Sequence, residues 1–131
     1  MLSREVGGLK KRSNERFSFK VSEQAGTVVL HCCGRICFRG EAQKFSRAAV
    51  QLLGSGKDIV LEFSDVKAMD SAGIGELVLV HMQARAFECA IRLAAPTPQV
   101  QGLLELTNVA ALFEIHSTVE SAVASGSIEV A

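Results

Sequence analysis

Aromatic residues are scarce in this 131-residue sequence: it has seven phenylalanines, no tryptophan and no tyrosine. Proteins that bind single-stranded nucleic acid stack the bases on aromatic side chains, and this chain offers few such platforms. An excess of charge of one sign is also missing, because 14 basic residues balance 14 acidic ones. Without a net basic field, the chain has no long-range attraction for a polyanion. We therefore predict that it does not bind nucleic acid.

Long apolar runs are absent as well. No apolar run approaches the roughly 20 residues of a membrane-spanning helix, so we predict no direct insertion into a membrane. The first nine residues contain Arg4 and Glu5 and no apolar block, which argues against a secretory signal. We therefore expect a cytoplasmic protein, in which thiols stay reduced. No CxxC pair occurs, and four free cysteines are expected: Cys32, Cys33, Cys37 and Cys89.

The chain does have enough apolar material for one compact domain, since 48% of its residues are hydrophobic and 21% are charged. Basic residues gather near its start: Arg4, Lys10, Lys11, Arg12 and Arg16. We interpret residues 1–16 as a flexible basic tail, residues 17–126 as the folded domain and residues 127–131 as a loose end.

The pattern of apolar residues alternates between strand and helix. Arg16–Ser22 and Thr27–Cys33 are β-prone segments on either side of a turn, which predicts an antiparallel hairpin ended by Gly34. Later strands are expected at Asp58–Phe63, Cys89–Ala94 and Phe113–His116. The helices are expected at Gly40–Leu53, at Ala72–Phe87, from Pro98 to near Asn108 with Thr97 as cap, and at Val119–Ser125 with Ser117 or Thr118 as cap.

Strands separated by helices of this length need crossover connections, so most of the sheet is expected to be parallel. The predicted fold is α/β: a single mixed β-sheet, with the opening hairpin antiparallel, packed by about four helices. In open sheets of this kind, binding sites gather at the carboxyl ends of the strands. The central strand Asp58–Phe63 is expected to end in a short connection, Val66–Asp70, which leads into the next helix.

This junction, Val66–Gly75, reads VKAMDSAGIG and is the most informative segment of the chain. Asp70 and Ser71 are both good residues to cap a helix. Gly73 and Gly75 fall in the first helical turn, where each costs about 0.8–1 kcal/mol relative to alanine. The two glycines indicate that some other group comes close to this backbone.

The hydroxyl of Ser71 is a candidate site of phosphorylation. A helix N-terminus offers free N–H groups and the positive end of the helix dipole, so the fold would tolerate a phosphoserine there. The phosphate would add roughly −1.5 to −2 charges at the surface, beside Asp70. A docked partner would be repelled while the domain stayed folded. The residues alone leave a second interpretation open, in which Ser71 is a plain capping serine.

The run Met69-Asp70-Ser71-Ala72-Gly73-Ile74-Gly75 resembles the signature of the STAS domain, as found in bacterial anti-sigma factor antagonists. That signature is Asp-Ser-small-Gly-aliphatic-Gly at the start of the helix that follows a central strand. The resemblance extends over Phe17–Ser125. It includes the turn Gly34-Arg35-Ile36 after the second strand, the DIVLEF strand, and a third helix that starts with proline.

The resemblance implies a partner switch. In that family the serine directly after the aspartate, Ser71 here, is phosphorylated by a serine kinase that is also the anti-sigma factor. The unphosphorylated domain binds this kinase and frees the sigma factor, phosphorylation ends the binding, and a separate phosphatase resets the switch. The residues expected to contact the partner are Asp70, Ser71, Ala72, Gly73, Ile74, Gly75, Arg35, Cys37 and Phe38.

Two features depart from the family pattern. Ala72 follows the phosphoacceptor where serine or threonine is common, and this change leaves the acceptor itself in place. Arg35 and Cys37 stand where the family usually has acidic residues. We therefore expect a partner with a different charge complementarity.

Other polar groups have structural interpretations. Gly54-Ser55-Gly56-Lys57 precedes a strand and lacks the spacing of a phosphate loop, so it is predicted to be a turn. His31 lies close to cysteines, but Cys32 and Cys33 would point to opposite faces of the sheet, and no metal site is expected. His81 is predicted to pack against the core. Since no nucleophile–base pair stands out, we expect neither an enzyme nor a cofactor.

Two other functions remain open at this point. The first is a STAS-like accessory subunit of a membrane transporter ATPase, in which docking is permanent and phosphorylation plays no part. The second is a scaffold within a larger stress-sensing complex. Under the leading hypothesis, the chain is a monomer or a weak dimer. Co-purification with an ATPase subunit, or a large particle size in light scattering, would favour one of the alternatives.

Overall fold

The computed structural model describes residues 16–130, with side chains described as far as Gly126. Its strands are β1 (Ser18–Gln24), β2 (Thr27–Ile36), β3 (Ile59–Met69), β4 (Ile91–Ala94) and β5 (Glu114–His116). Its α-helices are α2 (Phe38–Leu53), α3 (Ser71–Ala86), α4 (Pro98–Leu106) and α5 (Val119–Val130), and a 3-10 turn covers Ala110–Leu112.

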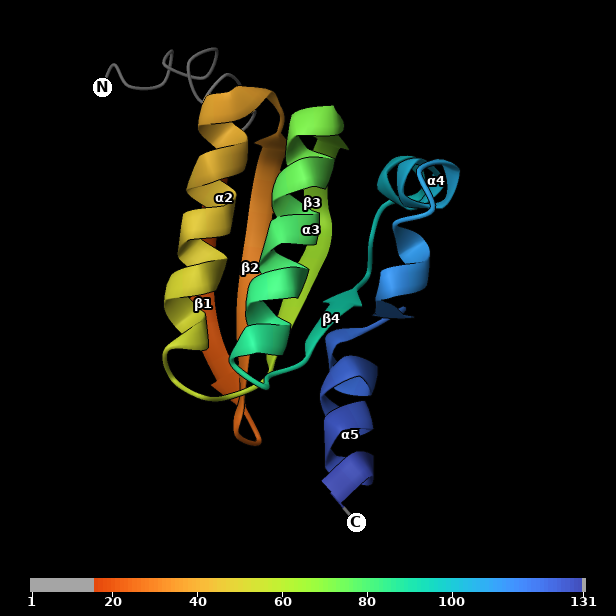
Figure 1. Cartoon of the computed structure of the whole chain (residues 1–131). Helices are drawn as coiled ribbons and strands as arrows, with labels where there is room; N and C mark the ends of the chain where they lie inside the picture. The colour runs from red at the N-terminus through yellow and green to blue at the C-terminus, as the bar shows by residue number, and fades with distance from the viewer. Residues whose placement is uncertain (1–15, 131) are drawn as a thin grey trace, which may run out of the picture.

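The five strands form one mixed sheet in the order β1-β2-β3-β4-β5. The hairpin β1–β2 is antiparallel, and the three other strand pairs are parallel. Helices α2 and α3 lie side by side over one face of the sheet (Figure 1), while α5 packs on the other face. The predicted fold class, an α/β fold with one mixed sheet and four α-helices, is confirmed for the described part of the chain.

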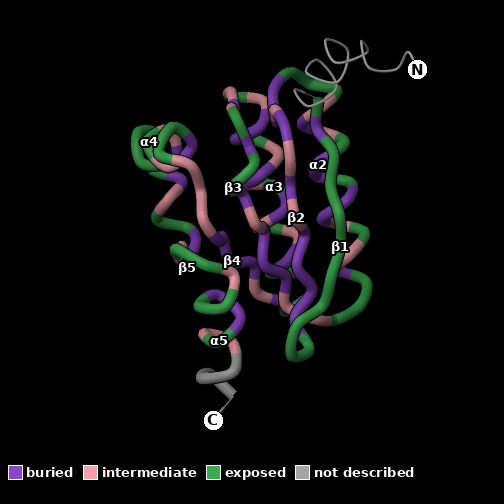
Figure 2. The backbone as a smooth tube through the Cα atoms, turned by 180° about the vertical axis from the view of Figure 1, so that it is seen from behind, coloured by how far each residue is buried: buried purple, intermediate pink, exposed green. Residues whose placement is uncertain are grey.

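Aliphatic rows on both faces of the sheet build the core. On the face covered by α2 and α3, Leu30, Leu61 and Leu93 lie next to one another on neighbouring strands, and all three are fully buried. On the other face, Val29 and Val60 form a smaller cluster with α5. Figure 2 shows β2 and β3 buried along much of their length, whereas the edge strand β1 is exposed throughout. Each fully buried leucine or valine contributes about 1.5–3 kcal/mol.

The central strands are longer than the sequence predicted. β3 continues through the segment Val66–Asp70 as far as Met69, so the prediction of a short connection there is wrong. Gly34 does not end β2, because it sits inside the strand at a register irregularity with a φ of 92°. The two extensions support each other, since Ile36 pairs with Met69 and both side chains are buried.

Several other boundaries differ by a few residues. β1 begins at Ser18 rather than Arg16, α2 begins at Phe38 rather than Gly40, and α5 continues beyond Ser125. Thr97 caps α4 as predicted, through a bond of 3.3 Å from the backbone N–H of Val100 to Thr97 Oγ1, and Pro98 starts the helix.

The division into a tail (1–16), a domain (17–126) and a loose end (127–131) stays a prediction. The basic residues Arg4, Lys10, Lys11 and Arg12 lie outside the described residues, whereas the backbone is helical as far as Val130. Among residues 16–130, no helix combines the length and apolarity needed to cross a bilayer.

Candidate functional site

The segment that stood out in the sequence lies where the two longest strands end. β2 ends at Ile36 and β3 at Met69, and each leads within two residues into a helix. The N-termini of α2 and α3 therefore meet at one end of the molecule (Figure 1). Because two helix dipoles present their positive ends here, this region favours negative charge.

Asp70 joins the two helix N-termini. Its Oδ1 accepts a hydrogen bond from the backbone N–H of Gly73 at 3.0 Å, which caps α3. Its Oδ2 accepts a second bond from the backbone N–H of Phe38 at 2.8 Å, at the first residue of α2. Phe38 has a φ of 61°, in the left-handed region that costs a side chain of this size about 1–3 kcal/mol. Since the side chain of Cys37, the N-cap of α2, makes no capping bond with a described residue, the carboxylate of Asp70 serves both helices.

These bonds keep the carboxylate of Asp70 ionised. Partial burial acts to raise the pKa of Asp70, but the backbone N–H groups of Phe38, Gly73 and Ala72 act against it and lower the pKa below its ordinary value. The site thus holds a fixed negative charge directly before Ser71.

Ser71 is the first residue of α3, and its side chain is exposed. Its hydroxyl makes no hydrogen bond with another described residue, because the capping role belongs to Asp70. The interpretation of Ser71 as a plain capping serine is therefore wrong. A free hydroxyl on the first turn of a helix is accessible to a modifying enzyme.

The two glycines of the motif play different structural roles. A Cβ on Gly73 would overlap the backbone carbonyl oxygen of Ile36, so this glycine lets α3 lie directly against the end of β2. The group that approaches Gly73 is thus part of the chain itself. A Cβ on Gly75 would meet nothing within 4 Å, and the residue is exposed. Gly75 leaves a bare stretch of helix backbone at the surface.

The remaining residues expected to contact a partner differ in exposure. Phe38 is 70% exposed and projects beside the motif, while Arg35 and Ala72 are half-buried. Cys37 and Ile74 are buried, at 4% and 8% exposure. Burial raises the pKa of the Cys37 thiol, and so does the charge of Asp70, against the opposing effect of Arg35. The accessible part of the predicted set therefore comprises Arg35, Phe38, Asp70, Ser71, Ala72 and Gly75.

A chain of three hydrogen-bonded side chains crosses the first three strands, and no local pattern in the sequence predicts it. Ser22 Oγ lies 2.9 Å from His31 Nε2, and His31 Nδ1 lies 3.1 Å from Glu62 Oε1. Glu62 is held in turn by the backbone N–H and the hydroxyl of Ser64. Serine hydrolases use the same order of groups, but Ser22 stands exposed on the edge strand. The arrangement ties β1, β2 and β3 together on the face of the sheet opposite to α2 and α3.

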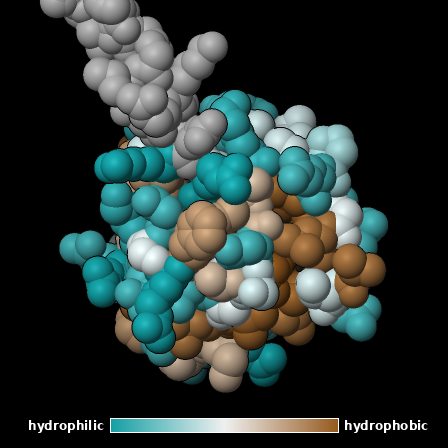
Figure 3. Space-filling model, turned by 90° about the horizontal axis from the view of Figure 1, so that it is seen from above, coloured by the Kyte–Doolittle hydropathy of each residue, from teal (hydrophilic) through white to brown (hydrophobic). Residues whose placement is uncertain are grey.

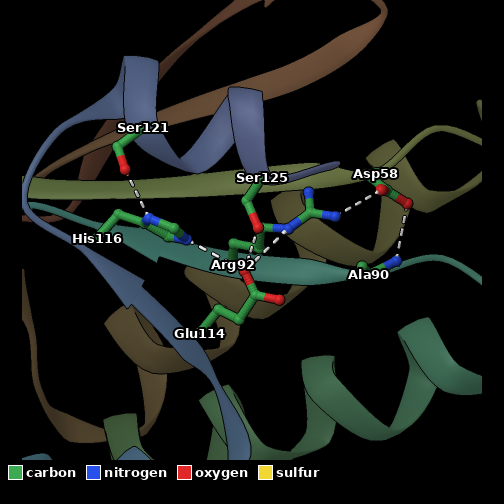
Figure 4. A network of polar contacts seen from close by, with 7 residues as sticks. All are labelled: Asp58, Ala90, Arg92, Glu114, His116, Ser121 and Ser125. Atoms are coloured by element: carbon green, nitrogen blue, oxygen red, sulfur yellow. Dashed lines mark hydrogen bonds and ion pairs between the residues drawn. The ribbon is translucent and has the colours of Figure 1, made fainter. Parts of the chain in front are cut away.

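A second polar network surrounds Arg92, which is 1% exposed (Figure 4). Its guanidinium lies 3.1 Å from Asp58 Oδ2 and 3.6 Å from Glu114 Oε1. Glu114 Oε1 also accepts a bond of 2.6 Å from Ser125 Oγ and lies 3.1 Å from His116 Nε2. The network joins the start of β3, the strands β4 and β5, and the helix α5. It is structural and lies apart from the Ser71 motif.

Other predictions about single residues can be compared directly. His81 packs as expected, with its ring centroid 5.2 Å from that of Phe113. Cys32 is buried and Cys33 half-buried on the opposite face of the sheet, and no described residues cluster as three or more metal-binding groups. Residues 54–57 form the predicted turn between α2 and β3.

The arrangement can be compared with known proteins. The model of the STAS domain matches residues 18–122, which is most of the chain. The chain belongs to the STAS domain family. The Asp70–Ser71 junction thus lies inside the matched region, at the start of the helix that follows β3.

Solved structures share this STAS fold at low sequence identity. A Thermotoga maritima protein proposed to be an anti-sigma factor antagonist is 24% identical, with a TM-score of 0.73 over 82% of this chain and 92% of that one. The phosphorylated form of SpoIIAA, a Bacillus cell fate determinant, is 18% identical, with a TM-score of 0.61 over 82% of this chain and 98% of that one. The murine anion transporter Slc26a9 is 15% identical, with a TM-score of 0.75 over 95% of this chain and 24% of that one.

Proposed function

We propose that this chain is an anti-sigma factor antagonist whose docking to a serine kinase is controlled by phosphorylation of Ser71. The observation that carries the proposal is the exposed hydroxyl of Ser71 on the first turn of α3, directly after the capping carboxylate of Asp70; it makes no hydrogen bond with any side chain or backbone group of residues 16–126. Because Asp70 caps the helix, a group added to Ser71 breaks no hydrogen bond of the fold.

The chemistry proposed for the switch is a simple phosphoryl transfer. The γ-phosphoryl group of ATP moves to Ser71 Oγ, the hydroxyl proton passes to a base of the kinase, and ADP leaves. The phosphate adds roughly −1.5 to −2 charges. The positive end of the α3 dipole makes this charge tolerable for the domain. A partner that buries the same surface would instead face two adjacent anionic groups, the phosphate and Asp70.

Membership of the STAS family supports the proposal. It is also supported by structural likeness to a protein solved in a phosphorylated form, SpoIIAA. Under the proposal, a separate phosphatase removes the phosphate and restores docking. The kinase and the sigma factor that it holds are the partners to be found, and the switch operates in the cytoplasm without a catalytic group of this chain.

In vitro labelling tests the phosphoacceptor. A serine kinase that co-purifies with the chain is incubated with the protein and radiolabelled ATP. We expect one phosphate per chain, lost in the variant Ser71→Ala. The matched control is Ser117→Ala, which removes another exposed hydroxyl at the start of a helix, where Thr118 caps α5 with a bond of 3.1 Å to Ser121 N–H. Equal labelling of Ser71→Ala and the parent chain would overturn the assignment.

A second candidate function is supported by one specific comparison. The likeness to the anion transporter Slc26a9 covers 95% of this chain, which fits a STAS domain that docks permanently on a transporter. Fractionation of host cells distinguishes the two functions. Stable recovery of the chain with a transporter subunit, unchanged in Ser71→Asp, would favour the transporter role. A scaffold role would show as a large homogeneous particle in light scattering.

A further inference from the structure

Helix α3 has an apolar surface on its outer side as well as on its inner side. Its core-facing residues are Gly73, Ile74, Leu77, Val80 and Ala84. The exposed residues on its outer side follow one another at three- or four-residue intervals and carry no charge: Ser71, Gly75, Leu79, Met82 and Ala86. We call this set the outer stripe of α3. Helices at a protein surface normally present polar residues to solvent, and a helix that is apolar all round is normally covered.

The outer stripe offers large contact groups. Met82 is 61% and Leu79 42% exposed, and Phe38 adds a 70% exposed ring at the same end as Ser71. Beside the stripe, a groove runs between α2 and α3, and its lining residues are Ser46, Arg47, Val50, Gln51, Leu79 and Gln83. Seen from the end that carries the helix N-termini, apolar surface gathers on one side of the molecule, while the other side is largely hydrophilic (Figure 3).

The rim of this groove is basic. Arg47 lines it directly. Arg39 precedes Ser46 by seven residues and Val50 by eleven, which places it on the same side of α2, toward α3. Among residues 16–126, no carboxylate lies within ion-pair distance of Arg39 or Arg47. The acidic residue of α3, Glu76, is half-buried, so it does not outweigh the two exposed arginines.

Other charged groups on these elements also favour a positive charge at this surface. The carboxylate of Glu41, on α2, accepts a hydrogen bond of 2.8 Å from the backbone N–H of Phe17. Arg85, in the last turn of α3, adds an exposed positive charge near the far end of the outer stripe. Arg35, which is half-buried, adds another beside Cys37, at the same end as Ser71. Arginines thus flank the apolar stripe along its length, while the carboxylate of Asp70, at its head, is bonded to the backbone N–H groups of Phe38 and Gly73.

We propose that the outer stripe and the adjoining groove bind an amphipathic helix of the partner, with an apolar ridge flanked by carboxylates. The inference rests on the proposed docking function and adds the chemistry of the partner surface. Amphipathic helices bind grooves of this kind through apolar residues at three- and four-residue spacing. A second copy of the chain is a poor occupant, because a two-fold contact would set Arg39 and Arg47 against the same arginines.

The position of Ser71 gives this chemistry a regulatory consequence. Ser71 stands at the head of the outer stripe, so its phosphate would face the carboxylates of the bound helix. Phosphorylation would then act twice, through repulsion of these carboxylates and through neutralisation of nearby arginine charge. A partner with a basic helix would respond in the opposite sense, because a phosphate would strengthen its binding.

Designed peptides test the charge of the partner. The probes are two fluorescein-labelled helical peptides of about 18 residues, identical in their leucine ridge, with flanks of glutamate in one and lysine in the other. Fluorescence anisotropy of each peptide is titrated with the full chain. We expect the glutamate peptide to bind at least about tenfold more tightly than the lysine peptide, and its affinity to fall with added salt.

Substitutions test whether the glutamate peptide binds at this surface. Arg39→Gln combined with Arg47→Gln should weaken the glutamate peptide about tenfold, and Met82→Glu should abolish its binding. The matched control combines Lys20→Gln with Lys67→Gln, exposed basic residues of β1 and β3 that lie away from the groove. Circular dichroism checks that each variant is folded. Equal affinity for both peptides, preference for the lysine peptide, no binding of either, or equal loss in the control would each overturn the proposal.

The outcome separates this inference from the proposed function. If Ser71 is phosphorylated by a kinase but the glutamate peptide does not bind, the partner chemistry is wrong and the switch stands. If the glutamate peptide binds the outer stripe and Ser71 is never phosphorylated, the docking surface stands and the switch is wrong. Self-association that blocks peptide binding, measured by light scattering with and without Met82→Glu, would assign the surface to a second copy and overturn the inference.

Discussion

The carboxylate of Asp70 accepts a hydrogen bond of 2.8 Å from the backbone N–H of Phe38, a residue 32 positions earlier in the chain. The same carboxylate caps α3 through Gly73 at 3.0 Å. One side chain therefore holds two helix N-termini together, and it fixes both Phe38 and Ser71 at the surface where docking is proposed.

Two substitutions at Asp70 separate its two bonds. Asp70→Asn keeps one carbonyl oxygen, which can cap α3, but its amide group cannot accept the bond from Phe38. We expect Asp70→Ala to lower the free energy of unfolding by about 2 kcal/mol and Asp70→Asn by roughly half as much. Urea unfolding followed by circular dichroism measures both. Equal stability of Asp70→Ala and the parent chain would show that neither bond matters.

The two glycines of the motif should respond in opposite directions to the same change. Gly73→Ala places a Cβ onto the carbonyl oxygen of Ile36 and should lower the free energy of unfolding by about 3 kcal/mol. Gly75→Ala meets open space and should raise it by about 0.5–1 kcal/mol, because alanine is the better helix former. Each variant serves as the control of the other in thermal unfolding. A stabilised Gly73→Ala protein would contradict the close packing of α3 on β2.

The buried Arg92 should make Asp58 important for stability. Asp58→Ala leaves the guanidinium with a weaker set of partners, and it also removes the acceptor for the backbone N–H of Ala90 at 2.9 Å. Because Glu114 remains 3.6 Å away, we expect a loss of about 2 to 3 kcal/mol. Asp65→Ala, at an exposed position of β3, is the control and should change stability by less than about 0.5 kcal/mol. Similar losses in both variants would argue against the Arg92 network.

Stability should also depend on pH in the acidic range. Hydrogen bonds from Ser125 and His116 lower the pKa of Glu114, against the effect of burial, and backbone N–H groups lower that of Asp70 although burial opposes them. A carboxyl whose pKa is lower in the folded state stabilises the fold above its unfolded pKa, about 3.9 for Asp and 4.3 for Glu. This stabilisation is lost as the pH falls through the folded pKa. We therefore expect the free energy of unfolding to be level above about pH 5 and to decrease below about pH 4.

Asp70→Asn combined with Glu114→Gln tests the origin of this acid sensitivity. The double variant should be less stable at neutral pH, and its free energy of unfolding should change less between neutral and acidic pH than that of the parent chain. Glu88→Gln, at an exposed position after α3, should keep the parental pH profile. An unchanged slope in the double variant would assign the acid sensitivity to other groups.

Much of the architecture was predictable because the signals are local. The alternation of β-prone and helical segments, the cap at Thr97 and the placement of Ser71 at the start of a helix all depend on residues close in the chain. The extension of β3 to Met69 was missed, because it depends on β2 continuing past Gly34 to supply a partner.

The contacts between distant residues were not predictable from local patterns. The bond between Asp70 and Phe38 requires β2 and β3 to end side by side. The line of Ser22, His31 and Glu62 depends on the register of three strands. Arg92 sits in a short strand where an arginine normally faces solvent, and here α5 packs against its guanidinium at Gly126.

The outer stripe of α3 was predictable only in part. Its residues are visible in the sequence as part of an apolar helix, but local patterns do not tell which apolar side chains a neighbouring element covers. The structure divides them into a buried set around Leu77 and an exposed set around Met82. The difference arises because α2 and the sheet cover only the inner side of α3 in the described part of the chain.

The most direct test of the central claim is the intact mass of the chain isolated from its own host, measured before and after phosphatase treatment. The account predicts a fraction of molecules heavier by one phosphate, removable by phosphatase, with the modification mapped to Ser71 by fragmentation. Complete absence of phosphate across growth and stress conditions, or a phosphate mapped to another residue, would contradict the assignment of Ser71 as the switch.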